Sequence, residues 1–357
     1  MTCYKIAVIE GDGIGHEVVP EGLRVLEAAG RSHDLSFSWQ HFDWGCQTYL
    51  KTGRMMPEDG LDQLRPFDAI YLGAVGYPGV PDHASLWGLL IPIRRAFQQY
   101  VNLRPVRLLR GVESPIKNFP PGEIDLCIVR ENNEGEYSEV GGRLYRHSDG
   151  ELAIQEAVFT RRGCDRIMRF AFDLAQSRKC HVTSATKSNG IIHTMPFWDE
   201  RFSLMTQNFP DIRADQYHID ILAAHFVKHP DWFDVVVASN LFGDILSDLA
   251  AAVVGSIGMA PAANLNPERQ YPSMFEPVHG SAPDIAGKGI ANPVAQIWSG
   301  AMMLRHLGEL KAAATVEKAV AAVLARPGVC TPDLGGNAST RDVGDAIARA
   351  ISVVAEA

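Results

Sequence analysis

The sequence predicts an α/β fold with a largely parallel central sheet. Strand-like apolar runs alternate with helical patterns along most of the 357 residues, which is the order expected when helices connect parallel strands. The apolar runs are short and nearly continuous, as in strands buried on both faces. The length leaves room for one large domain or two ordinary ones, and no internal repeat or low-complexity segment is present.

The elements follow in order from the amino terminus. The first strand-like run, residues 5–9, precedes Gly11-Asp-Gly-Ile-Gly15 and a helical pattern at about 17–29. We expect further strands at 68–75, 125–129, 181–186 and 235–238, and further helices at 164–176, 217–228, 293–307 and 315–325. Residues 132–154 differ, being Gly-rich, polar and alternating, and predict a projecting β-arm. Such an arm usually covers a partner, so we expect a homodimer.

Composition restricts the function. The net charge of −9 argues against a nucleic-acid partner and against a basic membrane-surface protein. No apolar run reaches the roughly 18 residues of a membrane span. The six cysteines are scattered without metal-ligand spacing, and the first strand begins close to Met1, leaving no room for a signal peptide. We therefore expect a soluble, cytoplasmic protein with free thiols.

A pair of acids marks the first candidate site. Asp244 and Asp248 are four residues apart, so on a helix both carboxylates project from one face about one turn apart. One interpretation is two solvated acids on an outer face. The surrounding Leu, Ile, Ala and Val residues make the segment mostly apolar, and acids in such surroundings are seldom buried unless paired or metal-bound. We therefore infer a hard divalent cation with oxygen ligands.

Three arginines at element ends suit carboxylate recognition. Arg94 borders an apolar helical stripe, and Arg104 is expected just past that helix, before a proline that stops it. Arg130 ends the strand around Ile128 and Val129. The guanidinium fork matches a carboxylate bidentately, although each arginine taken alone could serve a surface or structural salt bridge.

Other segments leave alternatives open. Gly11-Asp-Gly-Ile-Gly15 lacks the spacing of a dinucleotide fingerprint and fits a plain strand-to-helix turn equally well. Lys187 follows a strand, where functional side chains gather, and Asp220 fits either a first-turn acid or a ligand. The irregular segment from Phe275 to Pro293 could be a phosphate-approaching loop or a structural one.

Together these motifs resemble a known family from end to end. Gly11-Asp-Gly-Ile-Gly15, Asn102-Leu-Arg-Pro105, Val129-Arg-Glu131 with Tyr137, Asn240 to Asp248, and His279-Gly-Ser-Ala-Pro-Asp284 are similar to motifs of the metal-dependent β-decarboxylating dehydrogenases of (R)-2-hydroxy acids. The resemblance implies an isocitrate/isopropylmalate dehydrogenase-like two-domain fold with a central mixed sheet, not a Rossmann fold. It implies a large cofactor-binding domain of residues 1–100 and 255–357, and a small dimerisation, substrate and metal domain of 101–254.

The resemblance also implies roles for the candidate residues. Asp244 and Asp248 would bind Mn²⁺ or Mg²⁺, with Asp220 from the other subunit, and K⁺ helps in some relatives. The substrate carboxylates would be held by Arg94, Arg104 and Arg130. Lys187 of the partner subunit would accept the C2 hydroxyl proton while hydride leaves for NAD, and Tyr137 would reprotonate carbon after CO₂ loss.

The cofactor is expected to be NAD. Asp284 takes the place of a basic residue in NADP-dependent relatives, and a carboxylate there accepts a hydrogen bond from the ribose 2′-hydroxyl and repels a 2′-phosphate. The cofactor-binding residues that the resemblance implies are Ile14, Ala74, Asn189, His279, Gly280, Ser281, Ala282, Asp284 and Asn292.

The expected substrate follows from short segments in which this sequence differs from isocitrate and isopropylmalate dehydrogenases. Ser85-Leu-Trp-Gly88 and Arg130 to Tyr137 look like tartrate/D-malate dehydrogenases, and Trp87 should narrow the space for a third substituent. We expect oxidation of D-malate to pyruvate and CO₂, and oxidation of tartrate. The alternatives are a 3-isopropylmalate dehydrogenase, a catalytically silent regulatory subunit, and a plain metal-binding scaffold, which would leave the arginines unexplained. Glu10, where relatives usually have Pro, has no interpretation from sequence.

Overall fold

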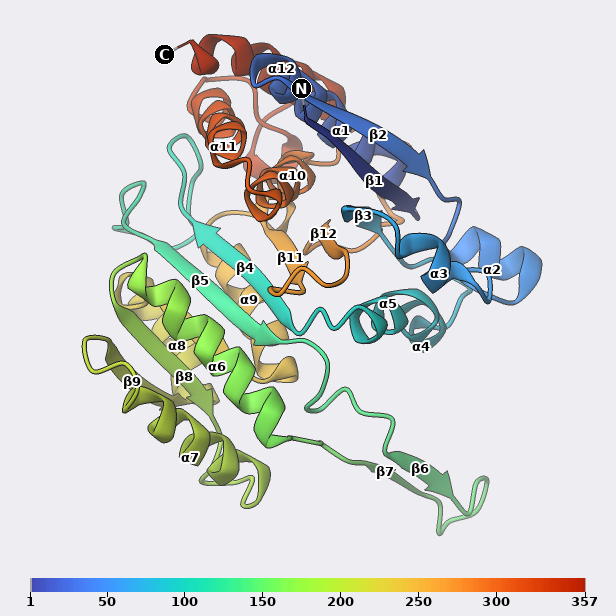
Figure 1. Cartoon of the computed structure of the whole chain (residues 1–357), viewed down its shortest axis with the longest axis vertical. Helices are drawn as coiled ribbons and strands as arrows, with labels where there is room; N and C mark the ends of the chain where they lie inside the picture. The colour runs from blue at the N-terminus through green and yellow to red at the C-terminus, as the bar shows by residue number, and fades with distance from the viewer. Residues whose placement is uncertain (1, 357) are drawn as a thin grey trace. The chain divides into compact units, whose positions relative to one another are not determined.

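The computed structural model describes residues 2–356 (Figure 1). Its contacts divide the chain into two compact units. Unit 1 consists of Met1–Gln99, Pro105–Ile124 and Ala251–Ala357, and unit 2 of Tyr100–Arg104 and Asp125–Ala250. Residues 105–124, which the predicted division places in the small domain, thus lie in unit 1, and the division into a cofactor domain and a substrate domain stays a prediction.

Unit 1 contains a mixed sheet with the strand order β2-β1-β3-β12-β11. Neighbouring strands are parallel except β11 and β12, which pair antiparallel from Pro261 opposite Pro277 to Asn264 opposite Met274. β3 is buried along its whole length, in keeping with its continuous apolar sequence. The bounds are β1 Thr2–Gly11, β2 Leu35–His41, β3 Ala69–Ala74, β11 Pro261–Leu265 and β12 Ser273–Pro277.

The helices of unit 1 include a packed group formed by α1, α10, α11 and α12. α10 is buried along most of its length and ends at Gly308, whose φ of 98° closes the helix in the left-handed conformation. α12 begins with a capping box between Ser339 and Asp342. The bounds are α1 Gly15–Ser32, α2 Cys46–Thr52, α3 Gly60–Leu64, α4 Asp82–Ser85, η1 Leu86–Leu90, α5 Ile91–Ala96, η3 Ile257–Met259, α10 Val294–Leu307, α11 Leu310–Leu324, η4 Pro332–Leu334 and α12 Thr340–Ala355.

Unit 2 contains the parallel strands β5-β10-β8-β9, with β4 (Val101–Arg107) next to β5 and its last residues in unit 1. α6 and α7 cover one face of these strands, and α8 and α9 lie on the other (Figure 1). The bounds are β5 Asp125–Glu131, α6 Arg161–Gln176, β8 His181–Thr186, α7 Thr194–Thr206, β9 Arg213–His218, α8 Ile219–Lys228, η2 Pro230–Trp232, β10 Val235–Ala238 and α9 Asn240–Val253.

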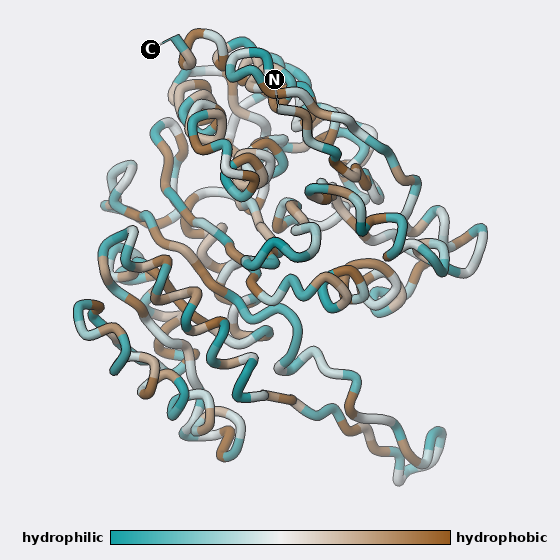
Figure 2. Tube along the Cα trace, in the orientation of Figure 1, coloured by the Kyte–Doolittle hydropathy of each residue, from teal (hydrophilic) through white to brown (hydrophobic). Residues whose placement is uncertain are grey.

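The predicted arm is a two-stranded antiparallel ribbon that extends away from the rest of unit 2 (Figure 1). Its strands are β6 (Gly141–Leu144) and β7 (Leu152–Gln155), and all their residues are exposed. Figure 2 shows apolar residues along this ribbon, and the exposed large ones are Val140, Leu144, Tyr145, Leu152, Ile154 and Val158. A two-stranded ribbon with an uncovered apolar surface is marginally stable by itself.

Two sequence expectations need correction. Arg104 was expected beyond a helix that reaches about Val101, but α5 ends at Ala96 and Arg104 lies inside β4. The positive φ of Gln98, 46°, ends the helical path early, and Tyr100 and Val101 are buried. The helix expected from residue 217 begins at Ile219, because Tyr217 and His218 still pair with β8. In residues 2–356, no helix has the length and apolarity that crossing a bilayer requires.

Candidate active site

The predicted helix carrying Asp244 and Asp248 is present as α9. Asp244 Oδ1 lies 3.2 Å from Arg104 Nη1, and the same carboxylate oxygen accepts a hydrogen bond from Arg130. Asp248 Oδ1 lies 3.8 Å from Arg104 Nη1. The arginine side chains are 8 % and 3 % exposed, whereas those of Asp244 and Asp248 are 35 % and 58 % exposed. Buried guanidinium groups therefore support a pair of acids that remains open to solvent.

A glycine allows this close approach of helix and strand. A side-chain β-carbon at Gly243 would lie 2.6 Å from the Cβ and Cγ of Arg130, so only glycine fits there without displacement. Arg130 also donates to Asn240 Oδ1 from Nε at 3.1 Å and from Nη2 at 2.7 Å. The start of α9 is thus fixed against the end of β5.

Tyr137 reaches the same carboxylate from the loop after β5. Its hydroxyl donates to Asp244 Oδ2 at 3.0 Å, and the Arg130 guanidinium lies 5.6 Å from its ring centre. Burial raises the pKa of Tyr137, and the negative charge of Asp244 raises it further. The phenol consequently keeps its proton at neutral pH and can act as a proton donor.

Lys187 and Asp220 form a separate pair within unit 2. Lys187 Nζ donates to Asp220 Oδ1 at 2.7 Å, and the two side chains are 30 % and 67 % exposed. Lys187 immediately follows β8 and Asp220 lies in the first turn of α8, as the sequence predicts. The hydrogen bond from Lys187 lowers the pKa of Asp220.

The carboxylates of Asp244 and Asp248 suit a divalent cation chemically. Carboxylate oxygens are the ligands that Mg²⁺ and Mn²⁺ prefer. Burial raises the pKa of Asp248 and the neighbouring Asp244 raises it further, so a cation between these acids would relieve their repulsion. Within residues 2–356 of one chain, no group of three or more His, Cys, Asp or Glu is arranged to hold a metal. Asp244 and Asp248 therefore provide a pair of oxygen ligands of the kind that these cations prefer.

Arg94 belongs to unit 1, and its partners Glu276 and Asn264 lie in the same unit. Its Nη2 donates to Glu276 Oε1 at 2.7 Å, and the same oxygen accepts from Asn264 Nδ2 at 2.7 Å. All three side chains are buried. Arg94 lies in α5 directly after the π-helical segment η1, which contains Trp87, and the Arg95 guanidinium covers the Trp87 ring at 4.9 Å. π-helical turns are frequent at functional sites.

The predicted cofactor loop of unit 1 packs on the glycine turn after β1. Ile14 N donates to Ser281 O at 2.9 Å. A β-carbon at Gly13, whose φ is 55°, would lie 2.1 Å from Ser281 O, so the turn requires glycine. Ile14 also packs against Ala282 and Ala291. Ala74 contributes its carbonyl oxygen to this turn, accepting from Asp12 N at 2.7 Å.

The remaining loop residues are presented in different ways. Burial lowers the pKa of His279, and its Nε2 is buried without a hydrogen-bond partner within residues 2–356. His279 is therefore a neutral imidazole at neutral pH, and the described residues leave its Nε2 unsatisfied. Gly280 and Asp284 are exposed, and Asn292 donates to Asp333 Oδ2 at 3.0 Å. Asn189 lies in the turn after β8 and belongs to unit 2.

Three glutamates that the sequence analysis did not single out support these sites. Glu17 accepts from the backbone N–H groups of Gly287 at 2.6 Å and Gly289 at 2.8 Å, which holds the predicted cofactor loop on α1. Glu136 binds the start of α9, and Glu276 binds Arg94. A glutamate two residues into a helix, as Glu17 is, gives a local indication of a role near the helix start. Glu136 and Glu276 depend on contacts that are distant in sequence.

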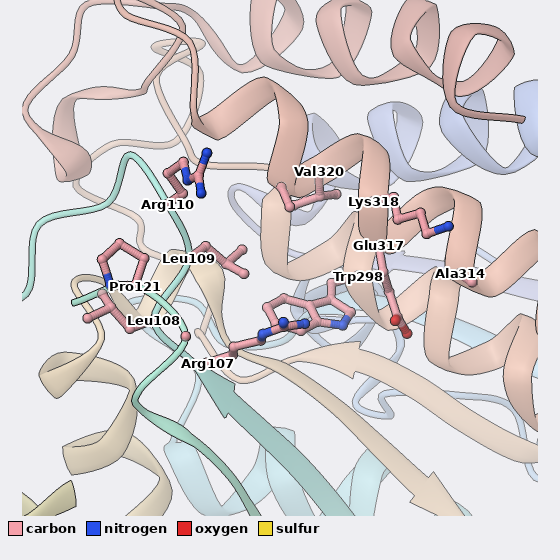
Figure 3. A pocket seen from close by; sticks show the side chains of 12 residues that line it. Arg107, Leu108, Leu109, Arg110, Pro121, Trp298, Ala314, Glu317, Lys318 and Val320 are labelled. Carbon is pink, nitrogen blue, oxygen red and sulfur yellow. The ribbon is translucent and has the colours of Figure 1, made fainter. Parts of the chain in front are cut away.

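Two cavities in unit 1 are lined by residues other than the predicted site residues. One has a volume of about 490 Å³, and Trp298, Arg107 and Glu317 are among the residues that line it (Figure 3). None of the residues predicted for the active site lines it. A second cavity of about 300 Å³ contains Glu10, whose carboxylate lies 2.9 Å from His16 Nδ1 and 3.5 Å from His41 Nδ1. Glu10 therefore has polar partners on both sides.

Comparison with known proteins places the whole chain among members of one family. The family model described as isocitrate/isopropylmalate dehydrogenase matches residues 5–347. The chain is 58% identical to the D-malate dehydrogenase [decarboxylating] of Escherichia coli K12, covering 98% of this chain and 99% of the relative. It is 56% identical to the tartrate dehydrogenase/decarboxylase of Pseudomonas putida, covering 96% of each.

A solved structure extends the comparison to the fold. The crystal structure of isocitrate dehydrogenase from Methylococcus capsulatus superposes with a TM-score of 0.88 at 35% identity, covering 98% of this chain and 99% of that one. The predicted α/β fold with a mixed sheet is confirmed. The chain belongs to the isocitrate/isopropylmalate dehydrogenase family of enzymes, among relatives named as decarboxylating dehydrogenases.

Proposed function

We propose that this protein oxidises D-malate and tartrate with NAD and a divalent cation, and that D-malate is decarboxylated to pyruvate and CO₂. The observation that carries the proposal is the convergence of Arg104, Arg130 and Tyr137 on Asp244, one helical turn from Asp248. Cations, a protonated phenol and two partly exposed acids are the groups that binding and protonating a hydroxy diacid requires.

In this proposal the chain's own residues bind the substrate, hold the cation and move protons. The guanidinium groups of Arg104 and Arg130, together with Arg94, bind and orient the substrate carboxylates. Bound Mn²⁺ or Mg²⁺ on Asp244, Asp248 and Asp220 of the partner subunit would supply Lewis-acid polarisation, and bound NAD would accept hydride.

Two residues move protons. Lys187 of the partner subunit, in its neutral amine form, accepts the proton of the C2 hydroxyl as C2 is oxidised. Loss of CO₂ leaves an electron pair at C3, and Tyr137 donates its phenolic proton to that carbon. The raised pKa of Tyr137 supports this role because the donor must be protonated at the working pH.

The proposed NAD specificity rests on the loop after β12. Asp284 is exposed there, so its carboxylate can reach a ribose 2′-hydroxyl and would repel a 2′-phosphate. His279 Nε2 and the turn at Ile14 complete the proposed adenosine site, with Gly280, Ser281, Ala282 and Asn292 nearby in the sequence.

A homodimer with shared active sites completes the proposal. The exposed apolar residues of the arm need a cover. Among the described residues, Asp220 does not join Asp244 and Asp248 in a group arranged to hold a metal. The proposal includes a cytoplasmic location, which the six free cysteines support.

The test is a substrate panel. Steady-state NADH formation is measured with D-malate, the tartrate stereoisomers, isocitrate and 3-isopropylmalate, using NAD or NADP and Mn²⁺. We expect the highest kcat/KM with D-malate or a tartrate and with NAD, and equimolar pyruvate from D-malate. A clear preference for 3-isopropylmalate would assign the chain to that activity instead, and no NADH with any substrate would indicate a regulatory subunit.

A further inference from the structure

Glu136, the residue before Tyr137, contacts the beginning of α9 with both carboxylate oxygens. Oε2 accepts from the backbone N–H of Leu241 at 3.0 Å, and Oε1 accepts from the Ser239 hydroxyl at 2.8 Å. The first N–H groups of a helix have no partner within the helix, so Glu136 caps α9 from a segment about a hundred residues away in sequence. The positive end of the helix dipole favours this negative charge.

The next residue makes the next contact along the same helix. Tyr137 donates to Asp244, which lies three residues after Leu241 and therefore about one turn further on the same side of α9. Two adjacent residues of the loop thus contact two successive turns of the helix.

A second hydrogen bond joins the same loop to α9 through the loop backbone. Asn240 Nδ2 donates to the backbone oxygen of Glu134 at 3.1 Å, two residues before Glu136. The carboxylate of Glu134 faces elsewhere, since it accepts from the backbone N–H and the hydroxyl of Thr160, both at 2.8 Å. Among the side chains of these loop acids, the one that contacts α9 and adjoins Tyr137 is Glu136.

We propose that Glu136 is a positioning residue that holds the Tyr137 hydroxyl on Asp244 by fixing residues 131–137 to the first turn of α9. This inference rests on the proposed function of Tyr137 as proton donor. Glu136 itself does not touch the substrate. Its removal leaves Tyr137 chemically intact but free to move relative to α9, and displacement of a catalytic group by about 1 Å can cost 100-fold in rate.

The test compares Glu136→Ala, Glu136→Gln and Glu134→Ala in the full-length protein. We expect Glu136→Ala to lower kcat for D-malate about 10- to 100-fold, with KM and the Kd for Mn²⁺ changed less than about threefold. Glu136→Gln, which keeps one acceptor oxygen, should recover part of the loss. The matched control Glu134→Ala removes a carboxylate from the same loop without touching α9, and should keep kcat within about threefold of wild type.

A double-mutant cycle with Tyr137→Phe shows whether Glu136 acts through Tyr137. We expect Glu136→Ala to have no further effect on kcat in the Tyr137→Phe protein, because residues acting as one unit are not additive. An equal loss in both backgrounds, or an unchanged kcat for Glu136→Ala, would overturn the inference. So would a loss expressed mainly in KM or in Mn²⁺ affinity.

Amide hydrogen exchange gives a readout that does not need activity. Glu136→Ala should lower the protection of the first turn of α9, including Leu241 N–H, and Glu134→Ala should not. Unchanged protection would refute the anchoring role even if the wild-type protein proved inactive on D-malate. Inactive wild type with the expected exchange change would refute the proposed function and leave the anchor established.

Discussion

Lys187 and Asp220 form an ion pair within one chain, with Nζ 2.7 Å from Oδ1. The lysine lies directly after β8 and the aspartate begins α8, so two short connections at the carboxyl ends of neighbouring strands bring them together. The hydrogen bond from Lys187 keeps the pKa of Asp220 below its ordinary value, so the carboxylate remains ionised, which is the form that a cation binds.

Replacing Lys187 should remove the proposed base. We expect Lys187→Ala to lower kcat for D-malate about 100- to 10,000-fold, the usual contribution of a positioned general base. Steady-state NADH formation measures this. The control is Lys179→Ala, whose ammonium group donates to the Asp125 carbonyl oxygen and should leave kcat near wild type. A Lys187→Ala enzyme that keeps wild-type kcat would show that another group accepts the hydroxyl proton.

Asp248→Asn tests the proposed metal ligand without changing the size of the side chain. Asparagine keeps one oxygen atom that can ligate the metal but lacks the negative charge of aspartate. The Kd for Mn²⁺ should therefore rise about 10-fold or more. Calorimetric titration or the electron paramagnetic resonance of free Mn²⁺ gives this Kd in the absence of substrate. The exposed Asp211 provides the matched control, Asp211→Asn. Equal Mn²⁺ affinity in wild type and Asp248→Asn would exclude Asp248 as a ligand.

Asp284 should set the preference for NAD. Asp284→Lys replaces repulsion of a 2′-phosphate by attraction, and each 1.4 kcal/mol of differential binding changes the preference about tenfold. We expect the ratio of kcat/KM for NADP to kcat/KM for NAD to rise at least about tenfold, with Asp284→Asn intermediate. The measurement is kcat/KM for NAD and for NADP at a fixed concentration of D-malate. An unchanged ratio would place the 2′-hydroxyl elsewhere.

His306 predicts an acid-sensitive step in stability. Burial, together with the smaller effect of the nearby Arg269 charge, lowers the pKa of His306 from 6.5 to about 4. Between pH 6.5 and 4, His306 binds a proton in the unfolded chain but stays neutral in the folded protein. The contribution of neutral His306 to the free energy of unfolding is therefore complete above pH 6.5 and is lost as the pH falls to 4. The loss is at most about 3.5 kcal/mol, from about 1.4 kcal/mol per pKa unit.

The measurement is urea unfolding between pH 4 and 8 for wild type and His306→Gln. Glutamine does not titrate and can replace the contact of His306 Nε2 with Ser273 Oγ, which spans 3.1 Å. The variant should lose less stability than wild type on acidification. The exposed His83 supplies the control, and His83→Gln should follow the wild-type curve. Parallel curves for wild type and His306→Gln would show that His306 is not held neutral by the fold.

The sequence predicted the helix of Asp244 and Asp248, the strand before Lys187 and the arm, because each depends on a local pattern of polarity. It misplaced Arg104, since the end of α5 depends on the single left-handed conformation of Gln98, which no periodicity reveals. The partners of Glu136 and Glu276 also could not be predicted. Glu136 and its partner Leu241 are separated by 105 positions in the sequence, and Glu276 and its partner Arg94 by 182 positions. Only the folded chain brings these residues together.

The central claim is that the acids of α9 hold a divalent cation that the reaction requires, and a metal titration tests it most directly. The protein is treated with EDTA and desalted, and NADH formation from D-malate and NAD is followed as Mn²⁺ is added. We expect no turnover without metal and saturable recovery with Mn²⁺, which Asp248→Asn shifts to higher concentration. Full turnover of the EDTA-treated protein without added metal would contradict the account.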